Sequence, residues 1–243
     1  SSPTQVGSDT TWSKSHTHGY KCSIAVKTDG TLWSWGYNTR GRLGLNNQTN
    51  YSSPVQVPGT TWSTTAGTLA GGGASNAGAI RTDGTLWMWG GNTNGNLGQN
   101  STSPSDGGLS SPVQVPGTAW SKICSAGYMV YATRTDGTLW SWGYNGHGAL
   151  GQNNKADYSS PIQIPGTTWS KVASSTTSAM AIKTDGTLWS WGLNNFGQLG
   201  NNDLVYRSSP IQVPGTTWNA VVGDATTFLA TKTDGTLWSW GQN

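Results

Sequence analysis

The sequence predicts an all-β protein, a β-propeller made of five repeats that each form one four-stranded antiparallel blade. The first observation is a motif, Thr-Asp-Gly-Thr-Leu-Trp, that occurs five times at steps of 54, 53, 49 and 49 residues. A period near 50 residues is typical of a unit that buries its faces only by stacking on copies of itself. The second is composition: glutamate is absent, and Thr, Ser, Gly, Asn, Trp and Val are abundant. This favours strands and tight turns over helices.

The third repeat illustrates how each element is predicted. Four short runs of alternating large and polar residues are separated by turn signals, and these runs are residues 110–115, 120–124, 129–135 and 138–143. Pro-Gly separates the first two runs, since proline sets φ and glycine accepts a positive φ. Asp136-Gly137 predicts a type I′ hairpin turn between the last two. A glycine-rich loop at 144–151 then leads to the next Ser-Ser-Pro.

Tryptophan supplies the expected core. All 15 tryptophans belong to the repeat, three per copy, and each buried Trp removes about 150–250 Å² from solvent. In the fourth strand two tryptophans lie on one face and leucine on the other, as expected for a blade between two neighbours. The residues assigned a structural role are Asp29, Gly30, Trp33, Trp35, Asp83, Gly84, Trp87, Trp89, Asp136, Gly137, Trp140, Trp142, Asp185, Gly186, Trp189, Trp191, Asp234, Gly235, Trp238 and Trp240.

The repeats run through the whole sequence, which predicts a single domain over residues 1–243. Their approximate limits are 1–51, 52–109, 110–158, 159–207 and 208–243. The chain starts at Ser-Ser-Pro and stops after Trp-Ser-Trp-Gly, so each unit is expected to hold all four strands. A closed five-bladed ring is favoured because an open arc exposes two strand edges. The alternative is that the five blades are a segment of a larger ring. The start at Ser1 suggests processing or a longer polypeptide.

The predicted strand order places the invariant Pro-Gly and Asp-Gly turns at one end of the blades and the variable connections at the other. Two insertions of the second repeat, near 67–73 and 101–106, fall at this variable end. We expect a partner-binding surface there, since loops on a rigid frame often bind; the alternative is that these side chains are only solvated. The candidate residues are Arg40, Arg42, Asn94, Asn96, His147, Phe196, Gln198, Ser101 and Asp106.

Signals of catalysis, metal binding or cofactor binding are weak. The Thr-Asp-Gly aspartates have a turn role, and the other five aspartates lie at unrelated repeat positions, so no acid/base pair is marked. His16 and His18 could face the same way on a strand, but no third ligand is near them in sequence. We therefore expect no enzyme, no cofactor and no metal. Cys22 and Cys124 occupy non-equivalent positions and are expected to be free thiols.

Charge and hydropathy argue against two classes of partner. Charged residues are 9% and the net charge is +3, whereas ordinary soluble domains have about 25% charged residues. The basic residues are scattered, so a nucleic-acid partner is not expected. No apolar stretch approaches the length of a membrane span.

The combination of Lys-Thr-Asp-Gly-Thr-Leu-Trp-Ser-Trp-Gly, a glycine-rich loop ending in Leu-Gly, and Ser-Ser-Pro-x-Gln-Val-Pro-Gly-Thr-x-Trp resembles the regulator-of-chromosome-condensation repeat. The resemblance covers essentially the whole chain and is closest to low-charge, Trp-rich bacterial and viral versions. It implies a propeller that usually has seven blades. Family repeats often carry a histidine seven residues before the aspartate, and here those positions hold Cys22, Asn76, Met129, Ser178 and Thr227.

Three functions follow as expectations. The first is a non-enzymatic structural or interaction module, a virion surface or tail component or another extracellular surface protein, within a larger assembly and with a protein or glycan partner. The second is a carbohydrate-binding lectin in which one Trp per blade is exposed. The third is implied by the resemblance, since the founding eukaryotic member promotes nucleotide exchange on a small GTPase and docks on chromatin; this chain departs from it in the histidine positions.

Overall fold

The computed structural model describes residues 2–19, 21–71, 76–103 and 107–242. They form five antiparallel sheets, which we call blades 1 to 5. Blade 1 holds β1 (Trp12–Gly19), β2 (Cys22–Lys27), β3 (Leu32–Gly36) and β4 (Tyr51–Val57), with a short 3₁₀ turn η1 (Thr39–Gly41). Blade 2 holds β5 (Leu69–Ala70), β6 (Asn76–Ile80), β7 (Leu86–Gly91) and β8 (Gly108–Gln114).

The last three blades follow the same order. Blade 3 holds β9 (Trp120–Ala126), β10 (Met129–Arg134), β11 (Leu139–Gly143) and β12 (Tyr158–Ile164). Blade 4 holds β13 (Trp169–Ser174), β14 (Ser178–Lys183), β15 (Leu188–Gly192) and β16 (Arg207–Gln212). Blade 5 holds β17 (Trp218–Asp224), β18 (Thr227–Lys232) and β19 (Leu237–Gly241). The expectation of an all-β propeller with five repeats is confirmed.

The strand order within a blade differs from the one predicted. Each Ser-Ser-Pro strand pairs with the Leu-Trp-Ser-Trp-Gly strand that precedes it, as β12 pairs with β11, where Trp140 lies opposite Gln163. It is therefore the fourth, outermost strand of one blade rather than the first strand of the next, and the Pro-Gly turn joins two blades. For the same reason the expectation that all five units hold four strands is wrong: blade 5 has three in the described part of the chain.

The hairpin turn between the second and third strands also differs from the predicted type I′. Only glycine has a positive φ, for example 79° at Gly137. The N–H of Gly137 donates to the carbonyl of Arg134, and the N–H of Arg134 donates to the carbonyl of Thr138. This is a three-residue loop in which a left-handed glycine closes the turn, and aspartate stays in an ordinary conformation.

Successive blades are joined by a hydrogen bond from an indole to the preceding loop. In blades 2 to 5 the last tryptophan donates from Nε1 to a main-chain carbonyl of the glycine-rich loop of the blade before, over 2.7–3.1 Å. The pairs are Trp89 with Arg42, Trp142 with Asn96, Trp191 with Ala149, and Trp240 with Gln198. The first three of these tryptophans are completely buried, so the joint combines apolar burial with a satisfied polar group.

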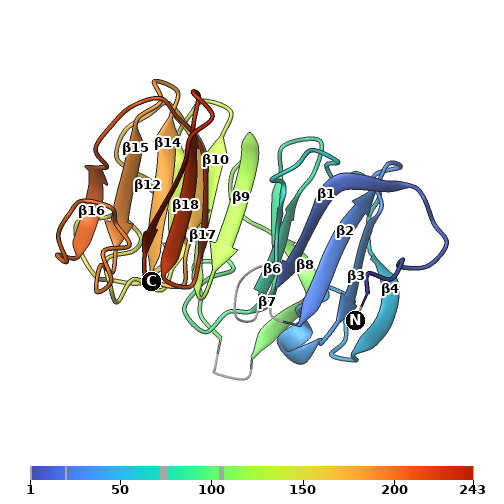
Figure 1. Cartoon of the computed structure of the whole chain (residues 1–243). Coiled ribbons are helices and arrows are strands. Elements are labelled where there is room, and N and C mark those ends of the chain that lie inside the picture. The colour runs from blue at the N-terminus through green and yellow to red at the C-terminus, as the bar shows by residue number, and fades with distance from the viewer. Residues whose placement is uncertain (1, 20, 72–75, 104–106, 243) are drawn as a thin grey trace.

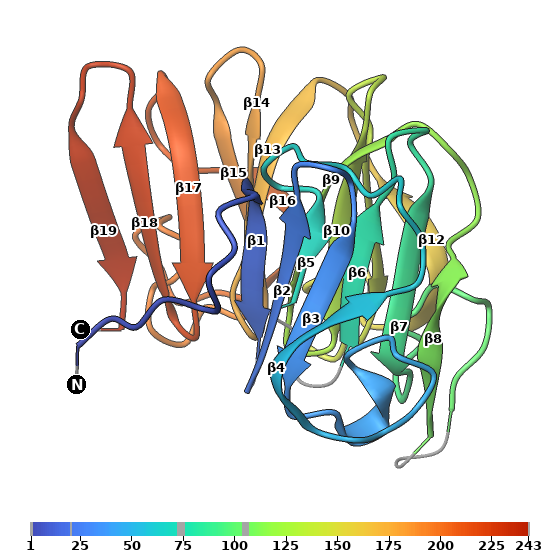
Figure 2. The same ribbon diagram turned by 90° about the vertical axis from the view of Figure 1, so that its right-hand side faces the viewer.

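The blades follow one another in an arc around a common axis, with blade 1 on the right of Figure 1 and blades 3 to 5 on the left. Their first strands, β1, β5, β9, β13 and β17, contact one another in sequence and therefore lie nearest the axis. Figure 2 shows all blades running in parallel, with the Asp-Gly hairpins at the top and the glycine-rich loops at the bottom. No helix in the described residues is long and apolar enough to cross a membrane.

Candidate protein-binding face

The Asp-Gly end of the blades is held by one hydrogen-bond chain that repeats five times. In the first copy Asp29 Oδ1 accepts from the N–H and the hydroxyl of Thr31, at 2.9 and 2.7 Å, and Thr31 Oγ1 accepts from Trp33 Nε1 at 2.8 Å. The same three bonds occur at the other four aspartates. The aspartates are committed to the turn and do not form a catalytic group.

These hydrogen bonds lower the pKa of all five turn aspartates. The threonine hydroxyl is the larger cause at Asp29, Asp83, Asp136 and Asp185, and the threonine N–H is the larger cause at Asp234. Donors that point at a carboxylate favour its ionised form. Near the first hairpin, the Lys27 side chain pairs with Asp9 and is the main cause of the lowered pKa of that carboxyl.

The basic residue at each hairpin lies between two tryptophan rings. The Arg134 guanidinium carbon is 4.4 Å from the Trp120 ring centroid and 4.3 Å from that of Trp140. Lys27, Arg81, Lys183 and Lys232 occupy the same position, 4.1–5.2 Å from their two indoles. Cation–π contact therefore explains why five basic residues share one repeat position, a role that the sequence pattern alone did not reveal.

The opposite end carries the variable loops, and the structure divides the predicted candidates into two groups. Side chains directly before the repeated glycine point outward: Phe196 is 45% exposed, and Arg40, Asn94 and His147 are partly exposed. Side chains directly after that glycine are buried, namely Arg42, Asn96 and Gln198. Their carbonyls accept the inter-blade indole bonds, so these three residues belong to the joints and are not available to a partner.

The remaining predicted candidates lie in the loops of blade 2. Ser101 is exposed, and its carbonyl accepts from Asn92 Nδ2 at 3.0 Å. Asn94 Nδ2 donates to Asp157 Oδ2 at 3.3 Å, which ties the loops of blades 2 and 3 together. Asp106 lies outside the described residues, as do parts of both insertions of the second repeat.

One loop exposes several large apolar side chains. Between β15 and β16, Phe196, Leu204, Val205 and Tyr206 are 45%, 63%, 55% and 40% exposed. We call these four residues the apolar loop patch. In the first copy the last three positions hold Gln48, Thr49 and Asn50, and in the third copy Lys155, Ala156 and Asp157. This substitution of polar by apolar residues was the sequence signal that could have identified the patch.

Aromatic contacts hold the patch against the neighbouring loop. The Tyr206 ring packs edge-on against His147 with centroids 6.4 Å apart, and His147 packs edge-on against Tyr144 at 6.1 Å. The Tyr206 hydroxyl donates to Asn195 Oδ1. The patch thus has Phe196 at the start of the loop and three consecutive residues, Leu204 to Tyr206, near its end. Tyr206 is therefore the member of the patch whose side chain is fixed by contacts with the neighbouring loop.

The histidines, tryptophans and cysteines that the sequence singled out differ in burial and in surroundings. His16 and His18 lie on β1, and the described residues contain no group of three or more His, Cys or Asp that could hold a metal. The lectin expectation required one exposed Trp per blade. The first tryptophans of blades 2 to 5 are at most 5% exposed, whereas the middle ones, Trp33, Trp87, Trp140 and Trp189, are half-buried and Trp238 is 47% exposed. The basic side chain of each hairpin already lies on the ring of this middle tryptophan. Cys22 and Cys124 are free thiols, as expected. Burial raises the pKa of both, that of Cys124 to about 12.

A family model described as the regulator of chromosome condensation (RCC1) repeat matches residues 29–66, 83–132, 136–182 and 185–225. The RCC1 domain-containing protein RUG3, mitochondrial, of Arabidopsis thaliana is 31% identical over 137 residues, which are 54% of this chain and 30% of that protein. The RCC2 homolog of Danio rerio is 34% identical over 137 residues, 56% of this chain and 27% of that protein. The chain thus spans less than a third of these relatives.

Among solved structures, Prp20p of Saccharomyces cerevisiae superposes with a TM-score of 0.74 at 21% identity, over 93% of this chain and 56% of that one. This likeness shows the fold. The named relatives correct two expectations. They include a mitochondrial protein and an RCC2 homolog, and Prp20p is described with its binding properties to Gsp1p and histones. The expectations of a virion component and of an extracellular location are wrong.

Proposed function

The chain belongs to the regulator-of-chromosome-condensation (RCC1) repeat family, and from this membership we propose that it is a non-enzymatic propeller module that binds a protein partner through its variable loop end. The observation that carries the proposal is the apolar loop patch. Four large apolar side chains are exposed on one loop, whereas three of these positions hold Gln48, Thr49 and Asn50 in the first copy and Lys155, Ala156 and Asp157 in the third.

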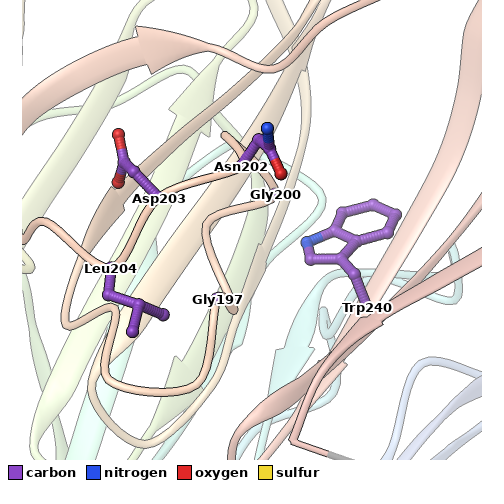
Figure 3. A pocket seen from close by; sticks show the side chains of 6 residues that line it. All are labelled: Gly197, Gly200, Asn202, Asp203, Leu204 and Trp240. Atoms are coloured by element: carbon purple, nitrogen blue, oxygen red, sulfur yellow. The ribbon is translucent and has the colours of Figure 1, made fainter.

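The composition of the patch is that of a protein-binding hot spot. Aromatic residues are enriched at the centres of protein interfaces, where a few of them carry most of the binding energy. Phe196 and Tyr206 are the two aromatic members, and Leu204 and Val205 add exposed apolar area. Leu204 faces blade 5, where it lines one cavity with Trp240 (Figure 3). Polar residues around them, including Asn195 and Asp203, can form the solvated rim.

The relatives support a protein as the partner class. Prp20p is described with its binding properties to Gsp1p and histones, and RCC2 homologs and RUG3 carry the same kind of repeat. The rigid blades would present the loops without a large ordering cost, because each loop is fixed by main-chain and side-chain hydrogen bonds such as Leu199 N–H to Asn194 Oδ1 at 2.9 Å.

The test compares two triple variants of the same chain. Phe196→Ser, Leu204→Ser and Tyr206→Ser together remove most of the patch. Thr28→Ala, Thr82→Ala and Thr135→Ala change three exposed positions at the Asp-Gly end. Proteins retained by the immobilised wild-type chain from the source cells are identified by mass spectrometry, and the affinity of the purified partner is measured by calorimetry.

We expect the patch variant to bind the partner at least tenfold more weakly, since single hot-spot residues contribute about 2 kcal/mol or more. The threonine variant should bind like wild type, and both should unfold at nearly the wild-type temperature. Equal binding by wild type and the patch variant would exclude the loop end as the interface.

A further inference from the structure

A cavity of about 270 Å³, which we call the axial cavity, lies among the first strands of the blades. It is lined at the ends of β1, β9, β13 and β17, and both β1 and β17 run toward the lower end of the molecule in Figure 2. Cys22 pairs with both Gly19 and Gly36, and the first glycine-rich loop starts directly after Gly36. The axial cavity is therefore at the glycine-rich-loop end, the same end as the apolar loop patch.

One short segment of each copy supplies the lining. Residues 125–127, 174–176 and 223–225 lie five to seven positions after the first tryptophan of their copies, and residues 18–19 lie six and seven positions after Trp12. The sixth position faces the cavity with a different residue in each of these copies, namely His18, Ala126, Ser175 and Asp224. The axis thus varies between copies, as the outer loops do.

Ser125 brings an unpaired hydroxyl to the axial cavity. The residue is 9% exposed, and its Oγ is buried without a hydrogen-bond partner in the part of the chain that the structure describes. Buried polar groups are nearly always paired, because an unpaired one costs free energy. Ser175 shows the contrast, since its hydroxyl accepts from the N–H of Ser178 at 3.1 Å and donates to the carbonyl of Ser178 at 3.3 Å. An occupant of the cavity would complete the hydrogen bonding of Ser125.

Asp224 places a carboxylate without a counter-charge beside this hydroxyl. The residue is exposed, and Oδ1 accepts from the N–H of Ala225 at 2.8 Å. Among the described residues, no lysine or arginine forms an ion pair with Asp224, and none lines the cavity. A positively charged group that donates several hydrogen bonds would satisfy both the carboxylate and the hydroxyl.

Contacts between neighbouring blades fix the wall of the axial cavity. The Thr176 hydroxyl donates to the carbonyl of Ala225 at 3.1 Å, which joins blade 4 to the turn that carries Asp224. A Cβ at Gly127 would lie 3.0 Å from the carbonyl oxygen of Thr176, and the φ of 56° at Gly127 also favours glycine. Blades 3, 4 and 5 are therefore held close here, so a ligand would meet positioned groups at little ordering cost.

The size and the acceptors of the axial cavity suit one basic side chain. Pockets for whole small-molecule ligands usually measure about 300–1,000 Å³, so a cavity of about 270 Å³ is small. A guanidinium carries five N–H donors in a planar fork, whereas an ammonium carries three donors on one atom. The acceptors come from three blades, with the His18 imidazole, the Ser125 hydroxyl and the Asp224 carboxylate. A planar fork can reach several of them at once, which favours arginine over lysine.

We propose that the axial cavity binds an arginine side chain of the protein partner, with the Asp224 carboxylate as its counter-charge and the Ser125 hydroxyl as a second acceptor. This inference rests on the proposed function, in which a protein docks at the loop end. The apolar loop patch supplies contact area in that complex, and the axial cavity supplies specificity. A partner without an arginine at the matching place would leave the buried hydroxyl and the carboxylate unpaired.

The first experiment needs no partner. N-acetyl-arginine amide is titrated into the full 243-residue chain, and NMR follows the backbone amides of residues 125–127, 174–176 and 223–225. We expect saturable shifts at these amides and at least tenfold weaker binding of N-acetyl-citrulline amide, which has nearly the same shape and no charge. Asp224→Asn should weaken binding of the arginine probe at least tenfold, because it removes the counter-charge.

Asp157→Asn is the matched control, since it removes the same charge from the same end of the molecule. Asp157 Oδ1 accepts from the N–H of Asn145 at 2.7 Å, and Asn50 Oδ1 makes the same bond to Asn38 in the first copy, also at 2.7 Å. Asparagine therefore fits this position, and the control should bind the probe like wild type. Equal weakening by both variants, equal binding of arginine and citrulline, or no saturable shift at the cavity would overturn the proposal.

Ser125→Ala tests the second acceptor. It should weaken binding of the arginine probe by about threefold or more, as expected for the loss of one hydrogen bond. Its Tm should equal or exceed that of wild type, because the hydroxyl has no partner to lose in the free protein. A lower Tm together with unchanged probe binding would show that Ser125 serves only the fold, and the cavity would lose its second acceptor.

The second experiment separates this inference from the proposed function. The protein retained by the wild-type chain is tested for binding to Asp224→Asn and to the triple variant of the apolar loop patch, and we expect both to bind it at least tenfold more weakly. Weaker binding by the patch variant alone would overturn the axial site and leave the loop end as the interface. Weaker binding by Asp224→Asn alone would keep the axial site and overturn the role of the patch. Probe binding without any effect of Asp224→Asn on the partner would assign the cavity to a free guanidinium compound and overturn the partner assignment.

Discussion

At the scale of residues, the aspartate, threonine and tryptophan of each hairpin act as one unit. The carboxylate accepts two bonds from threonine, and the threonine hydroxyl accepts one from the indole, in all five copies. The basic side chain two residues before the aspartate then covers the same indole. Polar residues at the surface thereby fix the orientation of a half-buried ring.

The lowered pKa of Asp136 gives this unit a defined pH dependence. Its folded pKa lies below the usual value of 3.8, so the ionised carboxylate stabilises the fold above the unfolded pKa. This contribution is lost as the pH falls through the folded pKa. Thr138→Val removes the hydroxyl and should raise the pKa of Asp136, measured by NMR titration of the side-chain carboxyl.

The other hairpins provide the control for this change. Asp185 should keep its lowered pKa in the Thr138→Val variant, and Thr187→Val should reverse the pattern. An unchanged pKa of Asp136 would show that the hydroxyl is not its main cause.

At the scale of elements, the joint between two blades depends on the strand that carries the last tryptophan of each copy. Trp142 is fully buried and donates to the carbonyl of Asn96 in the preceding loop, at 3.1 Å. Trp35 is its equivalent in blade 1, where it is half-buried and has no acceptor among the described residues. The two residues share the same strand position and sequence neighbours, and they differ in burial and in the inter-blade hydrogen bond.

Trp142→Phe should lower the free energy of unfolding by about 1–3 kcal/mol more than Trp35→Phe does. The first change leaves a buried carbonyl unpaired in addition to the lost bond, whereas the second removes no inter-blade bond. Chemical denaturation of both variants measures the difference. Equal losses would mean that neither the indole hydrogen bond nor the deeper burial of Trp142 adds to the stability of the joint.

At the scale of the whole molecule, the reactivity of the two thiols measures how readily the blades around them open. Cys22 is buried on β2, and Cys124 on β9 contacts Ser174 of the next blade, with Sγ and Oγ 3.7 Å apart. Burial raises the pKa of both. Cys22 is buried and becomes reactive only when blade 1 opens around it, whereas Cys124 is partly exposed and is kept unreactive by its raised pKa.

The native chain at pH 8 should react with a disulfide reagent on the order of 100-fold more slowly than a free thiol, since the thiolate is the reactive form. Both thiols should react at once in denaturant. The Cys124→Ser variant isolates Cys22, and rapid labelling of that variant in the native state would show that blade 1 opens locally.

The fold could be predicted from the sequence because each copy repeats the same environment, so the tryptophans, turn aspartates and glycines recur with it. The strand with which each blade begins could not be predicted. A periodic sequence does not reveal whether the Ser-Ser-Pro strand pairs with the strand before it or with the strand after it. The loop end was predicted from its variability. Arg42, Asn96 and Gln198 were assigned to the candidate surface because their side chains are polar. They are buried, since their main-chain carbonyls accept the indole hydrogen bonds between blades.

The exposure of the apolar loop patch could not be predicted from the sequence either. Leu204 and Val205 lie among residues that look like ordinary loop sequence, and only alignment with the other copies reveals that polar positions have become apolar. Their exposure is a property of the folded loop, and hydrophobicity alone would have suggested a buried strand.

The inter-blade joint has a consequence for how such a gene can change. The acceptor in every joint is a main-chain carbonyl, carried by arginine, asparagine, alanine or glutamine in different copies. Since any residue supplies that carbonyl, a duplicated or recombined repeat can follow any other without a matching mutation in its neighbour. The number of blades can therefore grow or shrink by unequal crossover, while point substitutions diversify each loop independently.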